Sequence, residues 1–346
     1  MSRIRRAIAI ATVMALSIEA CSERRVSREE TTPSVAARTS GASGPTAAGP
    51  TAAARTLLWR IEHRGRVSHL LGTLHVGVGM RDALGSVGTT ALDQSTTVFI
   101  ETGLDPAAMR ESLVSALVRA QLPEGESLRA LVGEQDFVKV TALLREFPAS
   151  ALDRLEPSLV AIFALGASMD RTSASIASDA GVVAPDATAT AASSAPSVSA
   201  EPMDYQIAQY AQRRGVRVNE LEAVSDQLAA FAGLGRAGAI EMLRALVRNP
   251  EANARVTTAM VEAYRSASAE QDVAALVRSM NALSPQFARM LIDDRNDRWM
   301  PTIERAVQAG GAFFAVGAAH TVGPKGIVAA LRARGYTVER VRTTAN

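Results

Sequence analysis

Apolar residues form short strand-like runs towards both ends of the chain and recur with helical spacing between them. Residues 56–76 predict a β-hairpin, in which Arg64-Gly65-Arg66 forms the turn. The short β-branched run at residues 97–101 predicts a buried strand that ends at Glu101. A further short strand is expected at residues 216–221. These short runs therefore indicate that the protein contains a β-sheet.

The middle of the chain has the apolar period of about 3.6 residues that is typical of amphipathic helices. Ser284-Pro285 supplies the residues expected to open a helix, Pro301 predicts a kink or a new segment, and Gly310-Gly311 predicts an end. The predicted helices cover residues 79–92, 106–120, 128–131, 134–145, 156–169, 203–214, 225–247, 249–279 and 285–307.

The last part of the chain predicts a strand, turn, helix and strand in succession. These lie at residues 312–316, at the turn Gly317-Ala318-Ala319-His320, at 326–333 and at 336–341. The expected fold class is therefore α/β, with a central mixed β-sheet, an N-terminal hairpin, a C-terminal β-α-β unit and a large helical middle region.

Two polar, low-complexity stretches interrupt this pattern. Residues 22–54 are rich in Ser, Thr, Ala, Gly and Pro, and we expect a disordered tether there because such a composition buries too little apolar surface to offset ordering entropy. A similar stretch at about 172–202 predicts a surface insertion within a single folded domain at residues 55–346.

The first 21 residues are typical of an export signal. Arg3, Arg5 and Arg6 precede an apolar stretch at residues 7–18, which is shorter than the roughly 20 residues that span a bilayer. Cys21 is the only cysteine of the chain and its position resembles a lipobox, although Glu19 departs from that pattern. The sequence predicts an exported, periplasm-facing membrane lipoprotein. Both the inner and the outer membrane stay open, and the alternative is an ordinary signal peptide cut near Ala20.

Composition and charge limit the classes of molecule that the protein is expected to bind. Aromatic residues make up 4% of the chain and the formal net charge is +2, without a basic stripe. Nucleic acid is therefore not expected as a partner.

Candidate chemistry lies at the ends of the predicted strands. The chain has four histidines, and two of them, His75 and His320, each end a Gly-x-x-His sequence that begins at Gly72 and Gly317. Glu101 ends a third apolar strand. Open α/β sheets present side chains to ligands at such strand ends, and two histidines with a carboxylate are ligand types of divalent metals in hydrolases.

Such a ligand set leaves coordination positions open for a water molecule, whose pKa a metal lowers towards about 7. No His-Glu-x-x-His or Gly-x-Ser-x-Gly sequence occurs, and Cys21 belongs to the predicted leader. The residues therefore favour metal-assisted hydrolysis over a Ser or Cys nucleophile.

These motifs together resemble the TraB/GumN family, which includes the Tiki proteases. The resemblance covers residues 56–342 and is carried by the stretches at 68–76, 98–101 and 313–323, and by Arg295-Asn296-Asp297-Arg298-Trp299. Met203-Asp204 and the stretch from Leu221-Glu222 to Gln227 match the family more loosely.

The resemblance implies a metal-dependent hydrolase that acts on a peptide or a small molecule. His75, Glu101 and His320 would bind a divalent metal such as Mn, Co or Zn, and Glu101 is a ligand or the general base. Arg295 would stabilise developing negative charge, and Asn296 would donate a hydrogen bond or cap a helix. More distant relatives include haem-binding lipoproteins, so a haem- or metal-binding protein without catalysis stays the alternative.

Several other polar residues have plain structural interpretations. His69 is expected as an exposed hairpin histidine, with a role as a further ligand left open. Asp204 and Glu222 are expected at a helix start and a strand end rather than in the site. For Arg295 the alternative is a solvated helix residue that pairs with Asp294 or Glu304.

Overall fold

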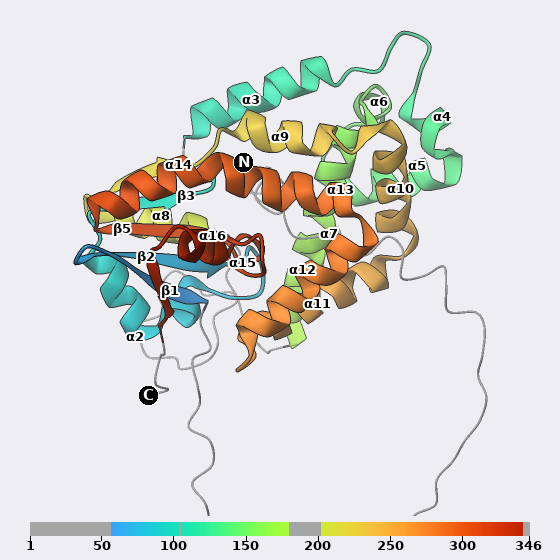
Figure 1. Cartoon of the computed structure of the whole chain (residues 1–346). Coiled ribbons are helices and arrows are strands. Elements are labelled where there is room, and N and C mark those ends of the chain that lie inside the picture. The colour runs from blue at the N-terminus through green and yellow to red at the C-terminus, as the bar shows by residue number, and fades with distance from the viewer. Residues whose placement is uncertain (1–56, 104, 180–201, 342–346) are drawn as a thin grey trace, which may run out of the picture.

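The computed structural model describes residues 57–103, 105–179 and 202–341 (Figure 1). The predicted leader, the lipobox residue Cys21, the tether at 22–54 and most of the predicted insertion lie outside these residues. The described part is a mixed α/β structure around one sheet, as the sequence predicts.

The sheet has six strands in the order β4-β3-β5-β2-β1-β6. β2, β3, β4 and β5 run parallel, whereas β1 is antiparallel to both of its neighbours. The strands are β1 (Leu58–His63), β2 (Arg66–Thr73), β3 (Thr97–Ile100), β4 (Arg217–Glu220), β5 (Ala312–Gly317) and β6 (Thr337–Arg340).

The apolar content of each strand matches its place in the sheet. All six residues of β5 are buried, because this strand lies at the centre between β3 and β2. The predicted hairpin forms with Leu58 opposite Leu71, and its turn places Arg64 and Gly65 at positive φ, as tight hairpin turns require.

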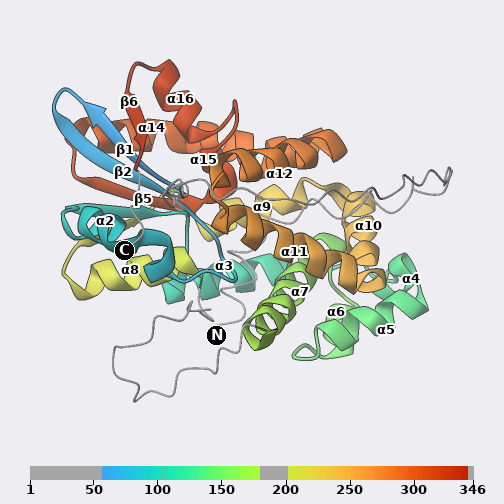
Figure 2. The same ribbon diagram turned by 90° about the horizontal axis from the view of Figure 1, so that it is seen from below.

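Helices cover both faces of the sheet, as Figures 1 and 2 show. α14 (Asp294–Ala309) packs on β1, β2 and β5, and α16 (Ile327–Ala333) packs on β6. On the other face, α2 (Met80–Asp93) contacts β2, and α8 (Met203–Arg213) contacts β3, β4 and β5.

The remaining helices form a region beside the sheet (Figure 2). This region reaches the end of β2 through α11, where Tyr264 Oη donates to the carbonyl of Gly72 (2.6 Å) and Arg265 donates to that of Gly77 (2.6 Å). Among the described helices, none combines the length and apolar character needed to cross a membrane. The helices of the region are α3 (Pro106–Arg119), α4 (Leu128–Val132), α5 (Glu134–Leu143), α6 (Ala149–Leu152), α7 (Pro157–Asp179), α9 (Val224–Ala232), α10 (Gly235–Arg248), α11 (Pro250–Arg265), α12 (Ala269–Leu283), α13 (Pro285–Ala288) and the π-helix η2 (Arg289–Asp293).

Some predicted helices differ from those observed. The stretch at 225–247 divides where Gly235 adopts positive φ, and the stretch at 249–279 divides at Ser266, whose backbone is extended. α7 continues to Asp179, so the beginning of the predicted insertion is helical. α14 continues through Pro301, which is exposed, so the predicted kink or new segment at this proline is not observed.

The C-terminal unit forms as predicted, and its two strands are separated in the sheet. β5 and β6 are not neighbours, because the N-terminal hairpin lies between them. The turn that begins at Gly317 contains a short helix, α15 (Ala318–Thr321), which holds His320.

Candidate functional site

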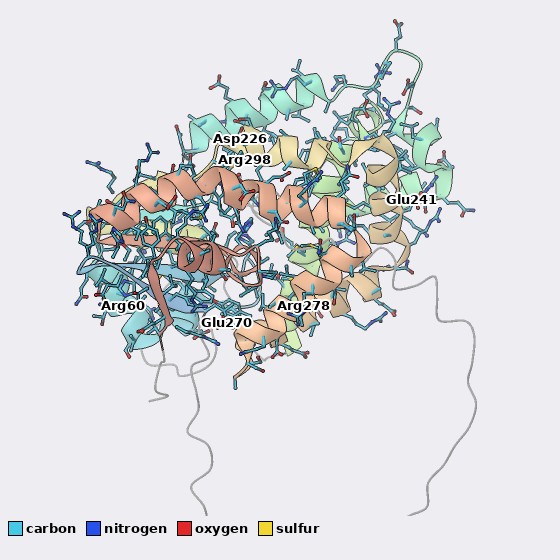
Figure 3. All side chains as sticks on the ribbon, viewed as in Figure 1. Arg60, Asp226, Glu241, Glu270, Arg278 and Arg298 are labelled. Atoms are coloured by element: carbon cyan, nitrogen blue, oxygen red, sulfur yellow. The ribbon has the colours of Figure 1, made fainter. Side chains whose placement is uncertain are left out.

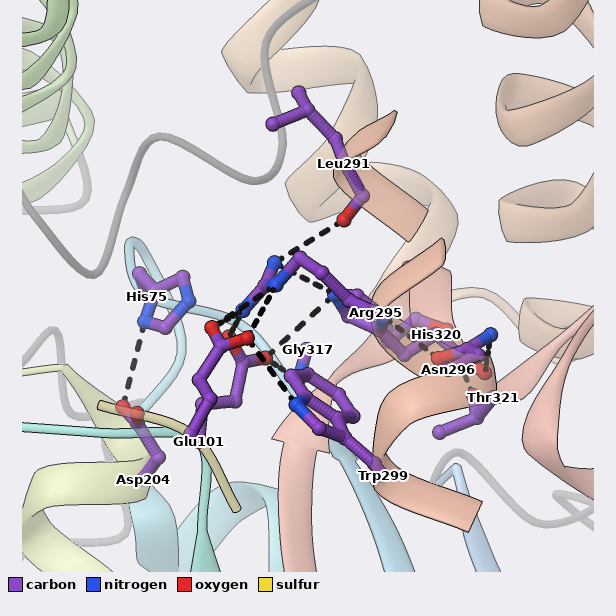
Figure 4. A network of polar contacts seen from close by, with 12 residues as sticks. His75, Glu101, Asp204, Leu291, Arg295, Asn296, Trp299, Gly317, His320 and Thr321 are labelled. Carbon is purple, nitrogen blue, oxygen red and sulfur yellow. Dashed lines mark hydrogen bonds and ion pairs between the residues drawn. The ribbon is translucent and has the colours of Figure 1, made fainter. Parts of the chain in front are cut away.

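Charged and polar side chains meet where the parallel strands end. Glu101 follows β3, Glu222 follows β4 by one residue, His75 lies in the loop after β2, and His320 lies in α15 after β5. Because these strands run parallel, their carboxyl ends share one edge of the sheet. We refer to His75, Glu101, Asp204, Glu222, Arg295 and His320 as the charged cluster (Figure 4).

Arg295 connects most of this cluster. Its Nη2 lies 2.6 Å from Glu101 Oε2 and 2.5 Å from Glu222 Oε1, and its Nε lies 3.0 Å from the same Glu222 oxygen. Nη1 donates to the carbonyl of Leu291 (3.1 Å) and lies 3.1 Å from His320 Nε2. These contacts use all five N–H groups of the guanidinium. Arg295 therefore bonds to a substrate only after it releases one of these partners.

Trp299 packs against the same guanidinium. The Arg295 guanidinium carbon lies 4.7 Å from the Trp299 ring centroid, and the centroids of the Trp299 and His320 rings are 4.6 Å apart. Trp299 Nε1 donates to Glu222 Oε2 (3.2 Å). The indole thus forms one wall of the cluster and holds both Glu222 and Arg295 in place.

Gly317 brings the backbone close to Glu101. Its N–H donates to Glu101 Oε1 (2.6 Å), and a Cβ at this position would lie only 3.1 Å from that oxygen. The glycine of the second Gly-x-x-His sequence is therefore needed because the Glu101 carboxylate packs directly on it. Gly72 is similarly crowded, since a Cβ there would meet the Ala318 backbone at 3.1 Å.

We expect Gly317→Ala to lower the free energy of unfolding by about 1–3 kcal/mol, because the added methyl displaces the Glu101 carboxylate. Gly238→Ala in α10 is the matched control. A Cβ there meets nothing nearer than 3.6 Å, so this variant should gain roughly 0.5–1 kcal/mol. Urea unfolding of both variants measures the difference, and equal effects of the two substitutions would contradict the crowding argument.

Asn296 determines the tautomer of His320. Asn296 Nδ2 donates to the carbonyls of His320 (3.2 Å) and Lys325 (3.0 Å), so its Oδ1 faces His320 Nδ1 at 2.8 Å. Nδ1 therefore carries the proton, and Nε2 accepts from Arg295. Burial, followed by the Arg295 charge, lowers the pKa of His320 to about 3. His320 is thus a neutral imidazole whose lone pair faces the cluster.

His75 makes an ion-pair contact with Asp204, which begins α8. His75 Nδ1 lies 3.3 Å from Asp204 Oδ1, and both side chains are almost completely buried. Among the described residues, neither ring nitrogen of His75 has a well-formed hydrogen bond, and the Thr73 and Thr102 hydroxyls beside the strand ends also lack one. Figure 4 shows the second His75 nitrogen facing Glu101 and Arg295. Buried polar atoms without partners call for an explanation, and a ligand bound among these side chains would provide one.

The carboxyl groups of the cluster have shifted pKa values. Burial favours a higher pKa for Glu101, but the nearby Arg295, with His320 and His75, holds it below its usual range. Burial raises the pKa of Glu222, and Arg295 offsets only part of that effect. Burial alone would lower the pKa of His75, yet Asp204, with help from Glu101, raises it. When its three carboxyl groups are ionised, the cluster has more negative than positive charge.

The cluster is closed to solvent in this structure, with exposed fractions from 0% for Arg295 to 8% for Glu222. Two described surface cavities lie between α3, α7 and α9 and between α5, α7, α10 and α11, and neither is lined by a cluster residue. Arg298, which projects from α14 (Figure 3), has a half-exposed side chain and lies 3.9 Å from Glu222 Oε2. Glu222 is therefore the member of the cluster nearest to the surface.

The structure brings together most of the residues predicted from the sequence. Glu101, Arg295, Asn296 and His320 are in direct contact, and His75 interacts electrostatically with Glu101 and His320. Arg295 pairs with Glu101 and Glu222 rather than with Asp294 or Glu304.

His69, the other histidine considered as a possible ligand, lies outside this group. It lies on β2, half-buried, and its ring packs near Phe313 with centroids 6.4 Å apart.

Asp204 and Glu222 belong to the cluster, although the sequence favoured structural roles for both. In the sequence, Trp299 stands out only as the last residue of Arg295-Asn296-Asp297-Arg298-Trp299. The signal that identifies Glu222 is its place just after the strand predicted at residues 216–221, which resembles the position of Glu101 after its strand. Asp204 begins a helix, so only the fold brings it next to His75.

The donor types of the cluster fit a divalent cation, since they are imidazole nitrogens and carboxylate oxygens around an excess of negative charge. The guanidinium of Arg295 occupies the point where Glu101, Glu222 and His320 converge and acts there as a stand-in cation. Within the described ranges no three His, Cys, Asp or Glu side chains are arranged to hold an ion directly. A metal at these donors therefore requires Arg295 to move.

Comparisons with known proteins identify one family. The model of the TraB/PrgY/gumN family matches residues 57–340, which include every described strand and every residue of the charged cluster. No curated protein and no solved structure matches this chain.

Proposed function

Because this chain belongs to the TraB/PrgY/gumN family, we propose that it is a metal-dependent hydrolase with the charged cluster as its catalytic centre. The observation that supports this proposal most is His75, a buried imidazole held beside Asp204 with an unpartnered nitrogen facing Glu101. The residues that would hold the metal are His75, Glu101 and His320. A bound divalent cation supplies a Lewis acid that lowers the pKa of a water molecule towards about 7.

The side chains around these ligands have separate tasks. Asp204 orients His75 through Nδ1, which leaves Nε2 directed at the cluster. Asn296 keeps the proton of His320 on Nδ1, so its Nε2 lone pair is available for binding. Asp204 and Asn296 are thus positioning residues.

Glu101 is the proposed proton acceptor. Its lowered pKa keeps it ionised at neutral pH, and the Gly317 N–H fixes the orientation of its carboxylate. Oε1 accepts from the Gly317 N–H and Oε2 accepts from Arg295, and each oxygen keeps a further lone pair that can take a proton from water.

The substrate class is proposed to be a peptide or a small carbonyl compound that water attacks. Export and a lipid anchor at Cys21 are proposed from the sequence of the first 21 residues alone.

Metal binding tests the proposal directly. Calorimetric titration of the purified chain with Mn²⁺, Co²⁺ or Zn²⁺ should give one equivalent of binding. His75→Ala with His320→Ala should weaken this binding roughly 100-fold or more, since removal of even an outer partner of a ligand costs 10–100-fold. The same samples should cleave members of a peptide library only with metal added and not with a chelator.

His69→Ala is the control, because His69 is a half-buried histidine outside the cluster. It should bind the metal as the unchanged chain does. Equal binding by the double variant and the unchanged chain would overturn the metal proposal. Metal or haem binding without any cleavage would instead favour a binding protein without catalysis.

A further inference from the structure

The guanidinium of Arg295 uses the donor atoms that a divalent metal would need. Two carboxylate oxygens, one each from Glu101 and Glu222, lie 2.6 and 2.5 Å from Arg295 Nη2. The lone pair of His320 Nε2 faces Nη1 at 3.1 Å. The same three donors, two carboxylates and a neutral imidazole, are a common ligand set for divalent metals.

Simultaneous binding of both cations is excluded by the lone pairs at His320. Nδ1 is protonated because it faces Asn296 Oδ1, so Nε2 has the single lone pair of the ring. That lone pair either accepts a hydrogen bond from Arg295 or coordinates a metal, and it cannot do both at once. Two cations a few ångströms apart, with the guanidinium fully buried, would also repel each other strongly.

A second, independent observation indicates a ligand at the same place. His75 is 5% exposed, its Nε2 has no partner among the described residues, and it faces Glu101 and Arg295 (Figure 4). Arg295 makes no hydrogen bond to this nitrogen. The cluster therefore has one more donor than the guanidinium uses.

The chain around Arg295 provides an alternative anchor for its side chain. Nη1 already donates to the carbonyl of Leu291, which belongs to the π-helix η2 directly before α14. Such π-turns widen a helix locally and recur at functional sites. This bond involves neither of the two carboxylates.

We propose that Arg295 is a built-in competitor for the metal of this site, and that Glu222 joins Glu101 and His320 as a metal ligand when Arg295 withdraws. This inference rests on the proposed function for the presence of a metal, and it adds the regulation of metal binding by Arg295 and a ligand outside the expected three.

Zn²⁺ titration of Arg295→Met tests the competition. Calorimetry should show binding at least about tenfold tighter than in the unchanged chain, which corresponds to about 1.4 kcal/mol. Arg248→Met is the matched control, because Arg248 also pairs with a buried carboxylate, Asp136, but in the helical region. The control should bind within about threefold of the unchanged chain. Glu222→Gln should weaken binding about tenfold in the Arg295→Met background.

A second measurement keeps Arg295 in place, so it does not depend on whether Arg295→Met folds. The chain has two tryptophans, and Trp59→Phe leaves Trp299, which contacts both Arg295 and Glu222, as the reporter. Saturating Zn²⁺ should change the emission of Trp299, because both contacts are replaced.

Each outcome distinguishes the competition from the proposed function. If Zn²⁺ binds the unchanged chain and Arg295→Met with affinities within about threefold, or binds without any change in Trp299 emission, the competition is wrong and the metal site stands. If neither chain binds Zn²⁺, Mn²⁺ or Co²⁺, both proposals are wrong.

Discussion

Glu101→Gln is expected to reduce peptide hydrolysis about 10³-fold, within the range that general acid–base groups contribute. The glutamine amide is nearly isosteric with the carboxylate, but it cannot act as a base. Its N–H groups would also face hydrogen-bond donors. Either the Gly317 N–H or Arg295 Nη2 would then face the amide nitrogen, because both now donate to Glu101. The expected loss of hydrolysis rate is therefore larger than the loss caused by the same substitution of a surface glutamate.

Initial rates on the cleaved library peptide measure this loss, with unfolding by urea as a check on the fold. Glu220→Gln is the control, because Glu220 lies in β4 beside Ile100 of β3 but outside the charged cluster. Activity should stay within a few-fold in this control. A Glu101→Gln chain that is folded and as active as the control would remove Glu101 from the chemistry.

Arg295→Met is expected to lower the free energy of unfolding by about 3–5 kcal/mol in the presence of a chelator. The substitution leaves the Glu101 and Glu222 carboxylates buried, 2% and 8% exposed, without their cation. Arg248→Met removes a half-exposed arginine and leaves Arg244 3.9 Å from Asp136, so it should cost only about 1 kcal/mol or less. Urea unfolding with a chelator present gives both values.

A second substitution tests the cause of that loss. In the Arg295→Met chain, Glu222→Gln removes one of the two uncompensated charges and should recover part of the stability, so the two effects should not add. Additive losses would indicate that packing of the arginine stem, rather than charge, accounts for the effect.

Local apolar patterns predicted most of the strands and helices, because each needs only a few neighbouring residues to be recognised. The hairpin, β3 and β5 lie close to their predicted bounds, and α13, η2 and α14 together cover the helix predicted at 285–307. The order of the strands was not predictable in this way. Nothing local in residues 312–341 indicates that β5 lies between β3 and β2 while β6 pairs with β1.

The residues of the candidate site also divide into those that local sequence identifies and those that only the fold brings together. Glu101 and His320 were identified because each follows a strand, and Gly317 because it belongs to a Gly-x-x-His sequence. Neither the contact of Arg295 with Glu222 nor that of Asp204 with His75 follows from spacing, since their partners are far away in the sequence. A lone arginine on a helix also gives no sign of burial, whereas Arg295 is 0% exposed.

The central position of β5 has a consequence for how the chain is made. β5 pairs with β2, and the Ser68 hydroxyl accepts from the Ala312 N–H across 244 residues of chain. Closing such a loop is entropically costly and slow compared with local helix formation. During synthesis from the N-terminus, β2 and β3 therefore have no strand between them until the C-terminal part has emerged. Gly317, His320 and Arg295 arrive with that part, so an incomplete chain has neither a finished sheet nor a complete charged cluster.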